Sequence, residues 1–208
     1  MNSHRWPAPV CLAEPRPGDF CCIPVSGSMG TGIEIGSWLA AMLEGSGGDG
    51  LQSYDHAEVY VGQPDEAGPH GYTYSAYPDN GSNGRTGKRP LPCAPEQLPG
   101  SIWSSGVIAL TPAQRAGIVA WCEAHPCVPY SWPDYVAIGL HALHLPVPRL
   151  RAYIKRTDRM ICSQYSDAAL NYGGGEHLFS DGRWEGYVTP YALAELLEAK
   201  ITLAAIRA

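Results

Sequence analysis

The sequence predicts a single α+β domain in which helices surround a small, mostly antiparallel sheet. Three observations lead to this fold class. The chain has 208 residues, a length typical of one domain. Short apolar runs typical of strands lie mainly in its first half, whereas helical patterns dominate after position 111. The 24 glycines and 19 prolines fall largely between these runs, which indicates many short elements joined by loops.

The N-terminal part of the chain predicts a turn, a strand and a helix. Pro17-Gly18-Asp19 is a turn sequence, and the apolar run Phe20–Val25 behind it predicts a strand. After a Gly/Ser loop at 26–32, residues 33–44 carry apolar side chains at helical spacing. That spacing predicts a helix.

Three further strands are expected before position 111. The runs 56–61 and 72–77 are separated by a Gly/Pro-containing loop, so they are predicted to pair as a hairpin. The segment 78–99 is rich in turn residues and is expected to be a loop. Another short apolar run, Val107–Leu110, predicts the last strand.

Four helices are predicted in the C-terminal half. Thr111-Pro112 is a strong helix start, because Thr is a good N-cap, Pro suits the first helical position and Gln114 can close a capping box. This helix should end near position 124. Apolar patterns predict two more helices at 132–145 and 161–172, and a start signal at 189–190 predicts the last one, to about Lys200.

Composition and charge exclude several function classes. The hydrophobic fraction of 45% excludes disorder of the whole chain. The net charge of −6 argues against nucleic acid as a partner, and we interpret the one basic stretch, 149–159, as solvated surface. No run has the length of a signal peptide core or of a membrane span. We therefore expect a soluble, cytoplasmic protein without stable membrane insertion, with export by another route left open and its oligomeric state unspecified.

The cysteines and histidines predict neither a metal centre nor a disulfide framework. The seven cysteines have no paired C-x-x-C spacing, so mostly free thiols in a reducing compartment are expected. Cys21 and Cys22 should point to opposite faces of a strand. His141 and His144 are three residues apart on a predicted helix and could share a metal, but no third ligand stands nearby. We expect no metal and no cofactor.

Cys162 is the cysteine whose context is compatible with chemistry. It stands in Met-Ile-Cys-Ser-Gln-Tyr at the predicted start of a helix, where free N–H groups and the helix dipole stabilise a thiolate. A small buried hydrophobe is the alternative interpretation, because that is the commonest fate of a free cysteine.

His56 is the best candidate for the base that a thiolate nucleophile requires. It opens the strand Asp-His-Ala-Glu-Val-Tyr-Val-Gly at 55–62. Period-two alternation places His56, Glu58 and Tyr60 on one face and small or apolar residues on the other. The alternative is a structural histidine with satisfied hydrogen bonds.

These motifs together resemble the circularly permuted NlpC-type papain-like cysteine hydrolases, whose branches include YiiX-like and lecithin:retinol acyltransferase-like proteins. The resemblance lies in the Pro-Gly-Asp-Phe turn at 17–20, the His56 strand and the Ile-Cys-Ser-Gln-Tyr segment at 161–165, in that order. The segment 128–132 and the ending at 188–193 also resemble the family pattern. It implies one permuted papain-like domain over 1–208, with its core at about 15–198 and residues 1–14 as an extended segment.

The resemblance implies Cys162 as nucleophile, His56 as base and a third polar residue that orients the imidazole. In the family this residue lies on the strand after the histidine strand, where Ser75 stands. A serine cannot stabilise an imidazolium as a carboxylate does, so Glu58 and Asp79 are the substitutes, in that order.

The activity that the resemblance implies is cleavage of an amide bond in a cell-wall-type or other small peptide, through an acyl-thioenzyme. Tyr54, Glu58 and Ser163 are expected to contact this substrate, with Glu58 meeting an amino group. Aromatic residues expected in loops, among them Trp103 and Tyr130, favour a peptide. The alternatives are a lipid or ester acyltransferase or thioesterase of the same fold, a non-catalytic module that binds a peptide or partner, and a redox or metal protein.

Overall fold

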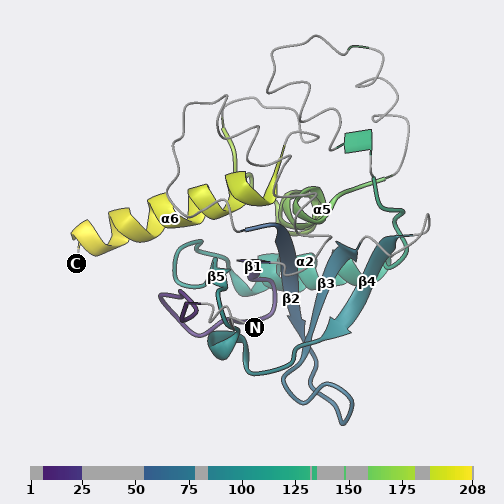
Figure 1. Cartoon of the computed structure of the whole chain (residues 1–208), viewed down its shortest axis with the longest axis horizontal. Coiled ribbons are helices and arrows are strands. Elements are labelled where there is room, and N and C mark those ends of the chain that lie inside the picture. The colour runs from purple at the N-terminus through teal and green to yellow at the C-terminus, as the bar shows by residue number, and fades with distance from the viewer. Residues whose placement is uncertain are drawn as a thin grey trace, which may run out of the picture.

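Figure 1 shows the computed structural model of the chain. The structure describes residues 7–24, 54–77, 84–131, 133–134, 148, 159–180 and 188–207. Several expectations fall outside these residues: the helix at 33–44, all but 133–134 of the helix at 132–145, the basic stretch except Arg159, and the residues Asp79, His141 and His144.

The described residues form an α+β fold around one five-stranded sheet, in which neighbouring strands are antiparallel. The strand order is β4-β3-β2-β1-β5, so the strands with the most apolar residues occupy the middle. The strands run side by side, and α2 crosses behind them in Figure 1. Their bounds are Phe20–Ile23 (β1), His56–Gly62 (β2), Tyr72–Tyr77 (β3), Arg85–Pro90 (β4) and Ile102–Trp103 (β5).

Three of the predicted strands are confirmed, and two predictions about strands are wrong. The segment expected to be a loop contains β4, whose sequence Arg-Thr-Gly-Lys-Arg-Pro is mostly exposed. Charged residues and Pro are common on edge strands because they discourage pairing with other chains, so this strand carries no apolar pattern. Val107–Leu110 is not a strand. The Val107 N–H donates a hydrogen bond to Ser104 O in a turn that follows β5.

The helical predictions agree with the described helices. α2 spans Pro112–Ala124 and begins with the expected capping box between Thr111 and Gln114. α5 spans Cys162–Ala168 and continues as the π-helical segment η3, Ala169–Gly173. α6 spans Pro190–Arg207 and is longer than predicted. A short 3₁₀ turn, η2, covers Pro95–Gln97.

The two faces of the sheet bury different side chains. Ala57, Val59 and Val61 pack into the main apolar core, together with Ile161 and Tyr165 from the region of α5. Tyr60 packs against a smaller cluster around Trp103 on the other face. The alternation predicted for this strand is therefore confirmed. Cys22 belongs to the main core and Cys21 to the smaller cluster, as their opposite orientation predicts, and all seven cysteines are free thiols.

A buried ion pair holds the turn that precedes β1. Asp19 is fully buried, and its Oδ2 accepts a hydrogen bond from the Arg16 N–H at 2.8 Å. Arg115 of α2 reaches both carboxylate oxygens, each at 3.0 Å. Gly18 has a φ of +92°, a conformation that glycine adopts without strain. The Gly18 N–H donates to Tyr60 O at 2.8 Å, so the turn is joined to β2.

Replacing Asp19 is expected to destabilise the fold strongly. Asp19→Ala leaves the Arg115 guanidinium, 11% exposed, without its counterion, and breaking a buried pair in this way costs about 3–5 kcal/mol. Urea unfolding measures the difference. Asp65→Ala is the control, because the exposed Asp65 also accepts turn hydrogen bonds, and it should cost no more than about 1 kcal/mol. Equal losses in the two variants would contradict the structural role assigned to the pair.

Candidate active site

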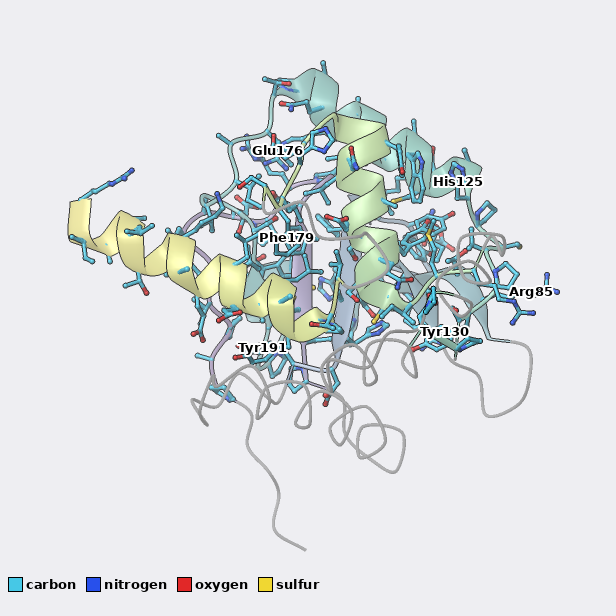
Figure 2. All side chains as sticks on the ribbon, turned by 90° about the horizontal axis from the view of Figure 1, so that it is seen from above. Arg85, His125, Tyr130, Glu176, Phe179 and Tyr191 are labelled. Atoms are coloured by element: carbon cyan, nitrogen blue, oxygen red, sulfur yellow. The ribbon has the colours of Figure 1, made fainter. Side chains whose placement is uncertain are left out.

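An extended segment at 128–131 connects the edge of the sheet to the start of α5. The Tyr130 N–H donates to Gly84 O at 2.7 Å, which adds this segment to the end of β4. On its other side the Met160 N–H donates to Pro129 O at 3.1 Å, and Tyr130 pairs with Met160 in a parallel bridge. Figure 2 shows Arg85 and Tyr130 near one another beside α5. The segment thus holds Met160, two residues before Cys162, in place beside the sheet.

Side-chain hydrogen bonds fix the first turn of α5. Cys162 is its first residue, and the Gln164 side chain accepts a hydrogen bond from the Ile161 N–H at 3.0 Å. The Ser163 hydroxyl donates to Val188 O at 2.7 Å and so ties this turn to the chain that enters α6. Ser163 is fully buried, so the hydroxyl that was expected to contact substrate is engaged within the fold.

The structure brings Cys162 and His56 together, although they are distant in sequence. Cys162 Sγ lies 4.0 Å from the carbonyl oxygen of Asp55, the residue before His56. Among the groups that raise the pKa of the His56 imidazole against the effect of burial, Cys162 is the largest, which places the two side chains within interaction range. Cys162 is fully buried and His56 is 6% exposed. These two residues are the candidate nucleophile and the candidate base that the sequence analysis selects.

Glu58 lies on the other side of His56 and is held by three side chains. His56 Nε2 is 3.2 Å from Glu58 Oε1, in a contact that has the distance of an ion pair but not the alignment of an ideal hydrogen bond. The Tyr77 hydroxyl donates to the same oxygen at 3.0 Å, and the Thr73 hydroxyl donates to Oε2 at 2.6 Å. Burial opposes ionisation of Glu58, but contacts with His56, Thr73 and Tyr77 bring its pKa below the usual value.

His56 is held in its charged form by its neighbours. Burial alone would lower its pKa, but Cys162 and Glu58 more than offset this and raise the His56 pKa to about 10. Of these two neighbours, Cys162 has the larger effect and Glu58 the smaller. The imidazolium is therefore the stable form of His56 at neutral pH.

The other candidates for the third position do not contact His56 through the bonds that the structure shows. The Ser75 hydroxyl, ranked first from the sequence, donates instead to Ala57 O at 2.5 Å. Asp79 lies outside the described residues. The contacts therefore favour Glu58, the second candidate, because it alone of the three is observed beside the imidazole.

Two residues of this cluster, Thr73 and Tyr77, were not among the sequence candidates. Both lie on β3, which pairs with β2 with Tyr60 opposite Thr73. Alternation along β3 places Thr73, Ser75 and Tyr77 on one face. The same alternation that selected Glu58 on β2 could therefore have found them, once the hairpin register was known.

The expected substrate contacts are mostly used inside the protein. Both oxygens of Glu58 have partners, so it is not available to bind an amino group. Trp103 and Tyr130 are buried rather than displayed on loops. Tyr54 is half-buried against the main core, and its pKa is raised to about 12 by burial and then by Glu198 and Cys22. It remains a candidate for substrate contact.

Within the described part of the chain, no group of three acidic, histidine or cysteine side chains could hold a metal ion. A search of the same residues finds no helix that is long and apolar enough to cross a membrane. Comparison with protein-family models, with curated proteins and with solved structures gives no match to this chain.

Asp134 is a second buried acid near the start of α5. It is fully buried, and its polar neighbours are the side chains of Ser131 and Gln164. Burial is the main cause that raises its pKa to about 6, against the opposing effect of these two neighbours. Asp134 is therefore easier to ionise in the unfolded chain than in the folded one.

The stability of the protein is expected to depend on Asp134 between about pH 4 and 7. Protonated Asp134 makes its full contribution to the free energy of unfolding at a pH below the pKa that it has in the unfolded chain. This contribution is lost as the pH rises through about 6, the pKa of Asp134 in the folded protein. Asp134→Asn cannot ionise, so the variant should gain stability relative to wild type between pH 4.5 and 7.5. Urea midpoints at both pH values measure this. Asp65→Asn is the control and should show no such gain, because hydrogen bonds lower the pKa of Asp65. A constant difference between wild type and Asp134→Asn would contradict the prediction.

Proposed function

We propose that the protein is a cysteine hydrolase that cleaves an amide bond in a small peptide. Cys162 is the nucleophile, His56 is the base, and Glu58 stabilises the imidazolium. The observation that carries the proposal is the placement of His56 between Cys162 and the Glu58 carboxylate. A nucleophile, a base and a group that orients the base are the parts that covalent acyl transfer requires.

The reaction begins from the pair in which the proton shared by Cys162 and His56 already lies on the imidazole. The thiolate attacks the amide carbonyl carbon, a C–S bond forms, and the C–N bond breaks as His56 gives its proton to the leaving amine. His56 then takes a proton from water, whose oxygen attacks the thioester and releases the acid and the thiol. N–H groups in the first turn of a helix have no partner within the helix, so that of Cys162 can stabilise the oxyanion.

The environment of His56 suits both halves of this cycle. Before acylation, the charge of Cys162 is one of the causes that raise the His56 pKa. Acylation removes that charge, so the pKa of His56 falls and the ring can release its proton to the leaving group. Glu58 remains in place throughout and stabilises the ring each time it is protonated.

The sequence motifs support a peptide as the substrate class. The turn at 17–20, the His56 strand and the Cys162 helix resemble the permuted NlpC-type hydrolases, many of which act on cell-wall peptides. In the structure the turn is joined to β2, and the Cys162 helix meets the same strand at its beginning. The three motifs of the resemblance are thus adjacent in space.

A papain-like module that binds a peptide without cleaving it is the second candidate. The burial of Cys162 favours it, since a substrate reaches a fully buried sulfur only after the surrounding chain moves. A screen of peptidoglycan stem-peptide fragments, read by the appearance of new amino groups, separates the two. Hydrolysis by wild type and none by Cys162→Ala supports the hydrolase.

Thiol reactivity gives a test that needs no substrate. At pH 6 an ordinary thiol is less than about 1% ionised, because its pKa is near 8.5. We expect iodoacetamide to alkylate Cys162 at least about tenfold faster than the exposed Cys127, and His56→Asn to remove this advantage. Cys21 and Cys22 should stay unmodified, because burial raises the pKa of each. Peptide mass spectrometry measures all four sites. A Cys162 that stays unmodified while Cys127 reacts would rule out the hydrolase.

The role of Glu58 is tested by comparing two variants. Glu58→Gln removes one cause of the raised His56 pKa, so the alkaline limb of the Cys162 alkylation profile should move to lower pH. A hydrogen bond to a charged group is worth about 1.5–3 kcal/mol, so turnover should fall roughly ten- to hundredfold. Ser75→Ala loses only a neutral bond to Ala57 O and should leave the alkaline limb in place. Identical profiles for the two variants would remove Glu58 from the mechanism.

A further inference from the structure

We propose that Tyr77 is a positioning residue of this site, whose phenol keeps the Glu58 carboxylate ionised and turned toward His56. The inference rests on the proposed function, in which Glu58 supports the His56 base. It adds the group on which Glu58 itself depends. No sequence motif pointed to this residue.

Tyr77 contacts both members of the Glu58–His56 pair. Its hydroxyl donates to Glu58 Oε1 at 3.0 Å, and the same oxygen lies 3.2 Å from His56 Nε2. Its ring centroid is 5.1 Å from that of the imidazole, with the planes tilted by 38°. One side chain therefore fixes the carboxylate oxygen that faces His56 and restricts the imidazole ring.

The position of Tyr77 is itself well defined. It is the last residue of β3 and pairs with Arg85 of β4. The guanidinium carbon of Arg89, also on β4, lies 3.4 Å from the centroid of the Tyr77 ring. A cation over an aromatic face is attracted by the electrons of the ring, so Arg89 helps to hold the ring in place. The ring is 6% exposed, so it has little freedom to turn away from Glu58.

The surroundings of Glu58 explain why it needs this donor. The groups that face it in the described structure are His56 on its own strand, Thr73 and Tyr77 on β3, and Cys21 on β1. Arg89 lies over the ring of Tyr77 rather than beside the Glu58 carboxylate. Burial raises the pKa of Cys21, so its thiol is neutral, and His56 is the only cation among those four neighbours. Thr73 and Tyr77 are the neutral donors that complete the solvation of a buried anion.

Tyr77 remains a donor over the whole range in which the site works. Burial, followed by the charge of Glu58, raises its pKa well above the usual value, so the phenol keeps its proton. The hydrogen bond from Tyr77 is one of the causes that lower the pKa of Glu58, after those from His56 and Thr73. Removing this bond therefore raises the pKa of Glu58, and the carboxylate loses its charge at a higher pH.

Tyr72 provides a matched control on the same strand. Its hydroxyl donates to the Asp65 carboxylate at 2.6 Å, and Lys88 of β4 lies 4.3 Å from its ring centroid. The group of Tyr72, Asp65 and Lys88 thus has the same arrangement as Tyr77, Glu58 and Arg89. It lies at the other end of β3, away from Cys162. Tyr72→Phe and Tyr77→Phe thus remove the same kind of bond, one outside the site and one inside it.

The experiment compares these two variants with wild type by two measurements. The first is a ¹³C NMR titration of labelled glutamate, with the Glu58 signal assigned from its loss in Glu58→Gln. Tyr77→Phe should raise the Glu58 midpoint by about one pH unit, whereas Tyr72→Phe should leave it unchanged. The second is the alkylation rate of Cys162 against pH, whose acidic limb should move upward by a similar amount in Tyr77→Phe alone.

The outcomes separate the inference from the proposed function. A Glu58 midpoint that is the same in Tyr77→Phe and wild type overturns the role of Tyr77, even if Cys162 proves reactive. A raised midpoint in a protein whose Cys162 never reacts supports the coupling of Tyr77 to Glu58 and rejects the hydrolase.

A second pair of variants covers a failure of Tyr77→Phe to fold. Thr73→Val removes the other neutral donor and should also raise the Glu58 midpoint, while Thr73→Ser keeps the hydroxyl and should restore it. An unchanged midpoint in Thr73→Val would show that neutral donors do not set the charge of Glu58, which overturns the inference as well.

Discussion

The packing of α5 against the central strands is the interaction on which the rest of the structure depends. Every residue of α5 is buried, and helices this short are not stable in water without tertiary contacts. Tyr165 provides the main anchor, with its ring in the apolar core and its hydroxyl donating to Cys122 O of α2 at 3.1 Å. Because one end of α5 carries Cys162, the contacts that bury the helix also place the sulfur at the beginning of β2.

The sheet has two buried faces with different chemistry. One face packs apolar residues against the helices, whereas the other carries the buried polar residues His56, Glu58, Thr73 and Ser75 as well as the smaller apolar cluster around Trp103. A buried ion pair adds little net stability, because desolvation of the charges offsets their attraction. The pair between His56 and Glu58 is accordingly better explained by the chemistry of the site than by the stability of the fold.

Most of the fold could be predicted from the sequence because its central elements follow strong local patterns. Alternation identified β2 and β3, and the capping sequence at Thr111 located the start of α2. β4 carried no such pattern, since its register depends on backbone bonds to β3 rather than on apolar side chains. The end of α6 was missed because no stop signal marks it, and the helix continues past Lys200 through Ile201 and Thr202, which are weaker helix formers.

The candidate site was predictable to the extent that it depends on single motifs. Cys162 and His56 each stand in a recognisable local context, and the structure places them together. The contact between Glu58 and His56, like the donors Thr73 and Tyr77, depends on side-chain direction and strand register, which one sequence does not specify. Ser75 occupies the expected strand, but the nearby Ala57 carbonyl accepts its hydrogen bond. The preference for Glu58 over Ser75 thus rests on three-dimensional geometry.

The long C-terminal helix divides into two parts with different supports. Val188, just before α6, accepts the bond from Ser163, and the buried side chains of the helix end at Leu197. Beyond that point Leu203 and Ile206 are 51% and 76% exposed, and the helix extends past the sheet in Figure 1. Ile201 still packs against the main core, so the turns after it have the least tertiary support, and backbone bonds alone are marginal for so short a helical segment in water. Amide hydrogens in this part should therefore exchange with solvent through fraying, while those of the first turns exchange only when the core itself opens.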